Sequence, residues 1–150
     1  MRVLVCGGRM FSNRHLLERT LSAIHARRNI DRIIHGAAPG ADTMAATWAF
    51  EAGIRHDPYR AKWKDLDVPG AVIKQGEYGP YNARAGHDRN QRMLDLGVPH
   101  LVVAFPGGRG TLDMVKRARD AGCPVFEVLR DKVQDFDWSK VGDGEGEDRR

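Results

Sequence analysis

The sequence predicts one α/β domain in which a five-stranded parallel sheet carries helices on both faces. Five short apolar runs alternate with four segments of helical periodicity, and this alternation is typical of parallel strands joined by right-handed crossovers. Three of the runs end in glycine-bearing turns, which mark tight corners between a strand and a helix. The 150-residue chain is long enough for one hydrophobic core. The apolar runs are residues 2–6, 31–35, 54–59, 101–105 and 124–128.

The first run ends at Gly7-Gly8, and we expect a helix after it. Ser12 or Asn13 supplies the N-cap side chain, and one apolar stripe then repeats at helical spacing. That stripe is Leu17, Leu21 and Ile24. The segment has no G-x-G-x-x-G fingerprint, so a dinucleotide-binding dehydrogenase is disfavoured.

The second run leads into the turn 36–40 and a helix with one buried face. Residues 54–59 alternate apolar with polar positions, which predicts an edge strand. Prolines and glycines interrupt residues 60–81, so we expect a long loop or lid there. The buried face of the helix comprises Ala41, Met44, Ala45, Trp48 and Ala52.

The helix expected at 82–96 places an arginine on its inward face. Arg89 falls on the stripe formed by Ala85, Met93 and Leu96. A guanidinium in that position needs an anionic partner. The partner is either an acid of the chain, such as Asp42 or Asp113, or a phosphate or carboxylate of a ligand.

The segment 101–111 combines a buried strand with an anion-binding turn. Its apolar run stops at Pro106-Gly107-Gly108, and the helix that follows directs its free N–H groups back at the turn. Glycine lets a phosphate approach the backbone, and the helix N-terminus favours a negative group. We therefore expect a phosphate site at this corner.

The composition is that of a globular protein without a membrane segment. Apolar residues make up 41% of the chain and charged residues 29%, and no run approaches the roughly 18 apolar residues of a membrane span. The first six residues do not form a signal peptide, so we expect a cytoplasmic location. Cys6 and Cys123 give neither a disulfide framework nor a metal-ligand spacing, so we expect no metal.

The charge divides the chain into two parts. Residues 130–150 are polar and slightly acidic, and we expect a C-terminal tail that is disordered or lightly docked through Phe136 and Trp138. Residues 1–129 form the predicted domain and carry a net charge of +6. Such an excess attracts phosphates or nucleic acid.

The stretch Pro106-Gly107-Gly108-Arg109-Gly110-Thr111 resembles the PGGxGT signature of the LOG proteins and the wider SLOG superfamily, which includes the YspA, YpsA-type and DprA proteins. Residues 6–9, 35–42 and 86–93 resemble the YspA-like branch. The resemblance implies a Rossmann-like domain with strand order 3-2-1-4-5. Gly7-Gly8-Arg9 would then face 107–111 across one cleft, at the point where the winding of the sheet reverses.

A nucleotide or nucleotide-derived phosphate is the ligand that this cleft would bind. Backbone N–H groups of the 107–111 turn would hold the phosphate, Arg9 or Arg89 would neutralise it, and Asp42 would accept from a ribose hydroxyl or cap its helix. His35 and His87 would donate hydrogen bonds in the structure or act as acids. No pyridoxal phosphate context is present, and we expect no cofactor. The predicted ligand-binding residues are Gly7, Gly8, Arg9, Gly36, Asp42, Arg89, Asn90, Pro106, Gly107, Gly108, Arg109, Gly110 and Thr111.

LOG proteins remove the base from a cytokinin nucleoside 5′-monophosphate, and the resemblance raises that activity for this chain. Their motif continues PGGxGTxxE, but Met114 stands at the position of the catalytic glutamate, and Asn90 replaces a lysine. A thioether cannot stabilise an oxocarbenium-like ribose by charge. We expect nucleotide binding or sensing without this hydrolysis. The alternative is an N-glycosidic hydrolase using Arg89 with a carboxylate such as Asp88, Asp42 or Glu77.

A second alternative is single-stranded nucleic-acid binding, because DprA proteins share the fold and bind single-stranded DNA. Basic and aromatic side chains interleave over residues 60–92, as in a stacking groove. The competing interpretation is a lid or a dimer contact. The resemblance to LOG proteins, which are typically dimers, also implies a homo-oligomer. The interleaved residues are Arg60, Lys62, Trp63, Lys64, Tyr78, Tyr81, Arg84, Arg89 and Arg92.

Overall fold

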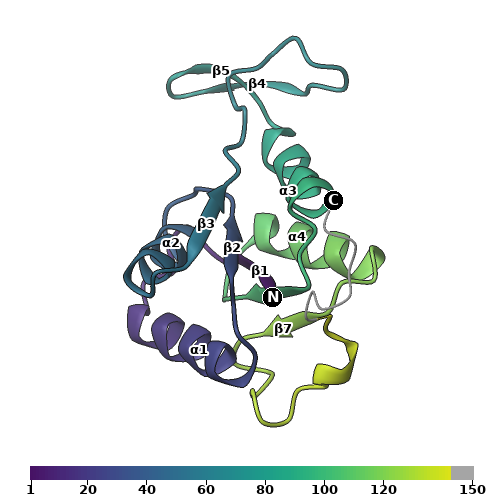
Figure 1. Ribbon diagram of the computed structural model, residues 1–150. Coiled ribbons are helices and arrows are strands. Elements are labelled where there is room, and N and C mark those ends of the chain that lie inside the picture. The colour runs from purple at the N-terminus through teal and green to yellow at the C-terminus, as the bar shows by residue number, and fades with distance from the viewer. Residues whose placement is uncertain (143–150) are drawn as a thin grey trace.

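The computed structural model describes residues 1–142 and contains a five-stranded parallel sheet (Figure 1). The strand order is β3-β2-β1-β6-β7, which confirms the predicted order 3-2-1-4-5. In this register Val3 lies opposite Leu101 across the β1–β6 pair. The strands are β1 (Arg2–Cys6), β2 (Arg32–His35), β3 (Arg55–Pro58), β6 (Leu101–Ala104) and β7 (Val125–Glu127).

Two helices cover each face of the sheet, as the Rossmann-like prediction requires. Successive side chains of a strand point to opposite faces, so Val3 and Val5 of β1 pack on one side and Leu4 and Cys6 on the other. The first side is covered by α1 (Arg14–Arg27) and α2 (Ala41–Glu51), and the second by α3 (Ala85–Gly97) and α4 (Arg109–Asp120).

Asn13, rather than Ser12, is the N-cap of α1, and its side chain accepts the Leu16 N–H at 3.0 Å. The predicted stripe Leu17, Leu21 and Ile24 is fully buried. Helix α2 ends at Glu51, so Ala52 is exposed and Ala49 takes the core position instead.

The buried face of α3 lies further round the helix than the face predicted from the sequence. Asn90, Met93 and Leu94 are its buried residues beyond Ala85, whereas Leu96 is 68% exposed. At about 100° per residue, Leu96 lies on the outer edge of this face, so its assignment to the core is wrong. Arg89 lies at the same edge and is partly buried.

The segment 60–81 was expected to be a loop or lid, but part of it forms regular structure. An antiparallel hairpin pairs β4 (Ile73–Gly76) with β5 (Gly79–Asn82) and projects away from the sheet, at the top of Figure 1. Its glycines and Pro80 hide the alternation that would have predicted strands. Two backbone bonds tie its base together, from Asn82 N–H to the Trp63 carbonyl and from Ala83 N–H to the Val72 carbonyl, both 2.7 Å.

The chain beyond β7 returns to the domain. Trp138, in the short helix η1 (Trp138–Lys140), is 5% exposed and belongs to the core on the α1 and α2 side, with Phe136 packed against it. The indole N–H donates to the Val133 carbonyl at 2.8 Å. The expected docking through Phe136 and Trp138 is therefore present, while the part of the predicted tail at 143–150 lies outside the described residues. No helix within residues 1–142 is long and apolar enough to cross a membrane.

Candidate ligand-binding cleft

Three strand-to-helix corners meet at the carboxyl end of the sheet. The Gly8 N–H donates to the Pro106 carbonyl at 2.9 Å, and the Ala41 N–H reaches the Gly8 carbonyl at 3.3 Å. Gly40 has φ of +82°, and a Cβ there would lie 2.2 Å from the Gly8 carbonyl oxygen, so only glycine fits. The predicted meeting of the first and fourth corners is confirmed, and the 36–40 turn joins them. This is the point where the winding reverses between β1 and β6.

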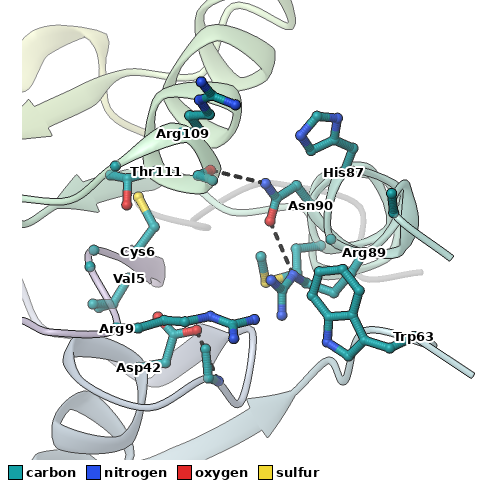
Figure 2. A pocket seen from close by; sticks show the side chains of 18 residues that line it. Val5, Cys6, Arg9, Asp42, Trp63, His87, Arg89, Asn90, Arg109 and Thr111 are labelled. Atoms are coloured by element: carbon teal, nitrogen blue, oxygen red, sulfur yellow. Dashed lines mark hydrogen bonds between the residues drawn. The ribbon is translucent and has the colours of Figure 1, made fainter. Parts of the chain in front are cut away.

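These corners enclose a cleft of about 380 Å³ together with the start of α3 and with Trp63 (Figure 2). Its floor is apolar and contains Val5, Cys6 and Met93, and burial raises the pKa of the Cys6 thiol. Polar side chains lie around this floor. Of the predicted ligand-binding residues, those lining the cleft are Gly7, Gly8, Arg9, Asp42, Arg89, Asn90, Gly108, Arg109, Gly110 and Thr111.

The N-terminus of α4 forms one side of the cleft. Gly108 stands at the cap position without a side-chain cap, and the first turn of α4 carries no acidic residue. Its first N–H groups have no partner inside the helix, and the helix dipole adds positive potential there. Gly110 has open space where a Cβ would be, so a ligand can approach its backbone. This corner has the properties of an anion site.

Arg89 reaches into the cleft from α3 and is held by uncharged acceptors. Its Nη1 donates to the carbonyls of Gly36 and Tyr59, the latter at 3.4 Å, and its Nε donates to Asn90 Oδ1 at 3.1 Å. A Cβ on Gly36 would lie 2.4 Å from Nη1, so glycine is required for this approach. Burial lowers the pKa of Arg89, and the Asp42 charge opposes this shift.

Neither ion pair considered from the sequence is formed. Within residues 1–142, no carboxylate lies within 4.0 Å of the Arg89 guanidinium. Its Nη2 also makes no hydrogen bond to this part of the chain, which leaves two N–H donors facing the cleft.

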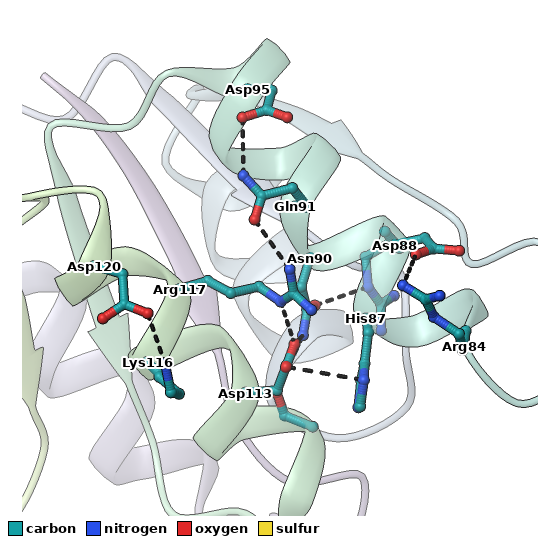
Figure 3. A network of polar contacts seen from close by, with 12 residues as sticks. Arg84, His87, Asp88, Asn90, Gln91, Asp95, Asp113, Lys116, Arg117 and Asp120 are labelled. Carbon is teal, nitrogen blue, oxygen red and sulfur yellow. Dashed lines mark hydrogen bonds and ion pairs between the residues drawn. The ribbon is translucent and has the colours of Figure 1, made fainter. Parts of the chain in front are cut away.

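Asn90 connects Arg89 to α4: it bonds Arg89 (Figure 2) and Asp113 of α4 (Figure 3). Its side chain is 4% exposed and donates to the Gly110 carbonyl at 3.2 Å and to Asp113 Oδ2 at 3.0 Å. Asp113 also accepts from Arg117 Nε at 2.9 Å. Burial opposes the shift, but hydrogen bonds from Arg117 and Asn90 lower the pKa of Asp113. Both N–H donors of the Asn90 amide and its oxygen therefore bind protein groups, and the residue links Arg89 to α4.

Asp42 holds the 36–38 turn in place. Its Oδ2 accepts the N–H groups of Gly36 and Ala38 at 3.1 and 3.3 Å. The cap position of α2 belongs to Gly40, so Asp42 is not the N-cap that the sequence allowed. Burial raises its pKa to about 6, although those two N–H groups and Arg89 act in the opposite direction. Among the described residues lining the cleft, it is the one carboxylate.

The remaining predicted residues lie beside the cleft. Pro106 supplies the carbonyl that binds Gly8, and Gly107 packs against the Thr111 hydroxyl. Asp88 does not line the cleft, and its carboxylate lies 3.8 Å from Arg84 on the outside of α3 (Figure 3). We therefore give Asp88 no part in the proposals below.

Met114 and the two histidines have distinct surroundings. Met114 is fully buried in the core between α4 and the sheet and does not reach the cleft.

The His35 side chain has a structural role: its Nε2 lies 3.0 Å from His56 Nδ1, and its Nδ1 accepts the Ala37 N–H. Burial, and then His56, lower the pKa of His35 to about 4. His87 lies on the rim, with Nδ1 3.9 Å from Asp113.

Trp63 is a site residue that the sequence did not assign to the ligand cleft. Its ring closes one side of the cleft against Gly86, and the Arg9 guanidinium lies 5.6 Å from the ring centroid (Figure 2). The one sequence feature that could have indicated this role is the presence of a tryptophan in a segment rich in glycine and proline. We considered it only for nucleic-acid stacking, because its partners in the 60–81 segment were unknown.

Several basic side chains of the predicted stacking groove instead bind the backbone of this segment. Lys64 donates to the Tyr78 carbonyl at 3.0 Å, and Arg92 donates to the Arg60 carbonyl at 2.8 Å. Arg84 donates to the Gly70 carbonyl. These contacts fit a folded lid better than an open groove.

No cluster of three or more His, Cys, Asp or Glu side chains that could hold a metal ion occurs in the described part of the chain.

Comparison with known proteins agrees with this fold. Residues 1–65 match the YspA, cpYpsA-related SLOG family. The Gene 61 protein of Mycobacterium phage D29 is 29% identical over 128 residues, which cover 83% of this chain and 94% of that protein.

A fold similarity extends over nearly the whole chain. The X-ray structure of DNA processing protein A (DprA) from Streptococcus pneumoniae matches with a TM-score of 0.64 and 22% identity. The match covers 95% of this chain and 53% of that one, so this chain spans about half the length of the DprA structure. The first 65 residues are thus similar to the YspA, cpYpsA-related SLOG family, and the fold of the chain is the Rossmann-like fold seen in DprA.

Proposed function

We propose that the cleft binds a nucleotide or a nucleotide-derived phosphate ligand. The phosphate would accept from the free N–H groups at the start of α4, with Arg89 opposite them. The observation that carries this proposal is the state of Arg89. Its partly buried guanidinium is held by carbonyl and amide oxygens, and among residues 1–142 no carboxylate contacts it and no acceptor binds Nη2, which faces the cleft. A charge removed from water in this way is stabilised by an opposite charge, which a bound phosphate supplies.

The balance of charge around the cleft supports the same proposal. Arg9, Arg89 and Arg109 line it, and Asp42 is the one carboxylate that the described part of the chain places there. A concave site with this excess raises the local concentration of anions. The volume of about 380 Å³ is within the usual range for small-molecule sites.

Binding or sensing is supported better than hydrolysis of the N-glycosidic bond. Hydrolysis needs a carboxylate beside the ribose and an acid for the leaving base. Asp42 has one oxygen committed to two backbone N–H groups, and the Met114 side chain lies in the core. A homodimer, implied by the resemblance to LOG proteins, is part of the proposal, and sedimentation analysis measures it.

Calorimetric titration with AMP tests the proposal. We expect the wild type to bind AMP and Arg89→Met to bind it at least tenfold more weakly, since a charged hydrogen bond contributes about 1.5–3 kcal/mol. Arg55→Gln is the matched control, because Arg55 is exposed at the amino end of β3, away from the cleft. Equal affinities in the wild type and Arg89→Met would refute the site.

Two further measurements separate binding from catalysis. Native mass spectrometry of the purified protein would show a retained nucleotide. Chromatography of AMP incubated with the protein would show free adenine if the bond is cleaved. Adenine release that disappears in Arg89→Met would replace the binding function by an enzymatic one.

A further inference from the structure

A second hollow, of about 250 Å³, adjoins the cleft on the side of the 36–39 turn. It shares Arg9, Ala38, Trp63 and Arg89 with the cleft and adds Arg60, which follows the carboxyl end of β3. The two spaces are therefore neighbouring parts of one site, with Trp63 and the two shared arginines between them.

The second hollow is strongly cationic. Three guanidiniums line it, those of Arg9, Arg60 and Arg89, and none of its described lining residues is acidic. Within residues 1–142, neither Arg9 nor Arg60 forms an ion pair with a carboxylate. One phosphate bound between the start of α4 and Arg89 would leave Arg60 without a counter-ion and Arg9 only partly neutralised.

Side chains, rather than backbone, supply the donors in this hollow. The N–H groups of Gly36 and Ala38 already bind Asp42, and that of Ala37 binds His35. A ligand group here would meet guanidinium N–H groups, whose planar fork matches phosphate oxygens in pairs. The recognised group is therefore an anion of phosphate type, not a neutral base or sugar.

Resting on the function proposed above, we infer that the ligand is a nucleotide with two phosphate groups, one at the N-terminus of α4 and the other among Arg9, Arg60 and Arg89. The phosphates are either joined as a pyrophosphate or carried on separate ribose hydroxyls. Trp63 lines both spaces, so its ring offers a stacking surface for the nucleoside. A nucleoside monophosphate would fill one half of the site.

The test compares three probes by calorimetry: AMP, adenosine 3′,5′-bisphosphate and ADP-ribose. We expect at least one of the two-phosphate probes to bind the wild type about tenfold more tightly than AMP does. Arg60→Gln should weaken the binding of that probe about tenfold more than it weakens the binding of AMP. Arg55→Gln, with the same loss of charge at the opposite end of β3, should leave the ratio of the two affinities unchanged. Circular dichroism checks that the variants are folded.

The outcomes separate this inference from the proposed function. The probe that gains affinity shows whether the phosphates are joined or separate. AMP binding as tightly as both other probes, or a ratio that Arg60→Gln leaves unaltered, would overturn the inference while the nucleotide site stands. Absence of binding by all three probes would overturn both.

Discussion

Replacing Asn90 by alanine should loosen the cleft and destabilise the protein by about 3 kcal/mol. The buried amide makes three hydrogen bonds, with Arg89, Gly110 and Asp113. A neutral bond contributes about 0.5–1.5 kcal/mol and one to a charged group about 1.5–3. Since Arg89 and Asp113 keep other partners, we take about 1 kcal/mol for each of the three bonds. The sum near 3 kcal/mol corresponds to a decrease in Tm of about 6–12 °C for a chain of this length.

The same substitution should weaken AMP binding about five- to tenfold. Without the bond to Asn90, the Arg89 side chain must be ordered on binding, which costs about 0.5–1.5 kcal/mol for one flexible side chain. Gln91→Ala is the control: this neighbouring amide bonds Asp95 and Arg117 at the surface of α3, away from the cleft. Urea unfolding followed by circular dichroism gives the stability, and calorimetry gives the affinity. If Asn90→Ala lowers stability but leaves the AMP affinity equal to that of Gln91→Ala, Asn90 does not position Arg89.

Trp63→Ala should weaken AMP binding about five- to a hundredfold, because stacking of a base on an aromatic ring contributes about 1–3 kcal/mol; Tyr78→Ala, at the exposed hairpin tip, is the control, and equal affinities would argue against stacking. The pH dependence of stability should show two opposing contributions. His35, with its pKa lowered to about 4, loses stability as pH falls from 6.5, whereas Asp42, with its pKa raised to about 6, loses stability as pH rises through 6. Between pH 6.5 and 4, Asp42→Asn should therefore lose about 2–3 kcal/mol more than the wild type in urea unfolding; parallel profiles would contradict the buried state of this carboxyl.

The sequence determined the strands and their glycine corners because those signals are local. An apolar run followed by Gly7-Gly8, or by Pro106-Gly107-Gly108, indicates where a strand ends and a turn begins. The order of the strands was not local information and came from the resemblance to SLOG proteins. Helical spacing also indicated that Arg89 faces inward, but at the edge of the buried face rather than within it.

The partners of the site residues could not be derived from spacing. Arg89 contacts the carbonyls of Gly36 and Tyr59, which lie 53 and 30 positions away, and only the packing of α3 on the sheet creates those contacts. Trp63 was missed for a similar reason, because its place depends on the two backbone bonds that fold the 60–81 segment. Asp42 was expected to cap its helix or bind ribose. It is instead the second residue of α2, and its carboxylate accepts two N–H groups of the preceding loop.

The choice of uncharged partners explains how Arg89 is fixed without losing its charge. A carboxylate in contact would hold the guanidinium just as firmly, but it would cancel the potential that attracts a phosphate, and the ligand would have to displace it. The Gly36 and Tyr59 carbonyls and the Asn90 amide use three of the five N–H donors and leave the net charge unchanged. Asp113, the nearest acid on α4, is instead occupied by Arg117 and Asn90. The polar network between α3 and α4 thus directs the negative charge away from the cleft and the positive charge into it, which is the arrangement that anion binding requires.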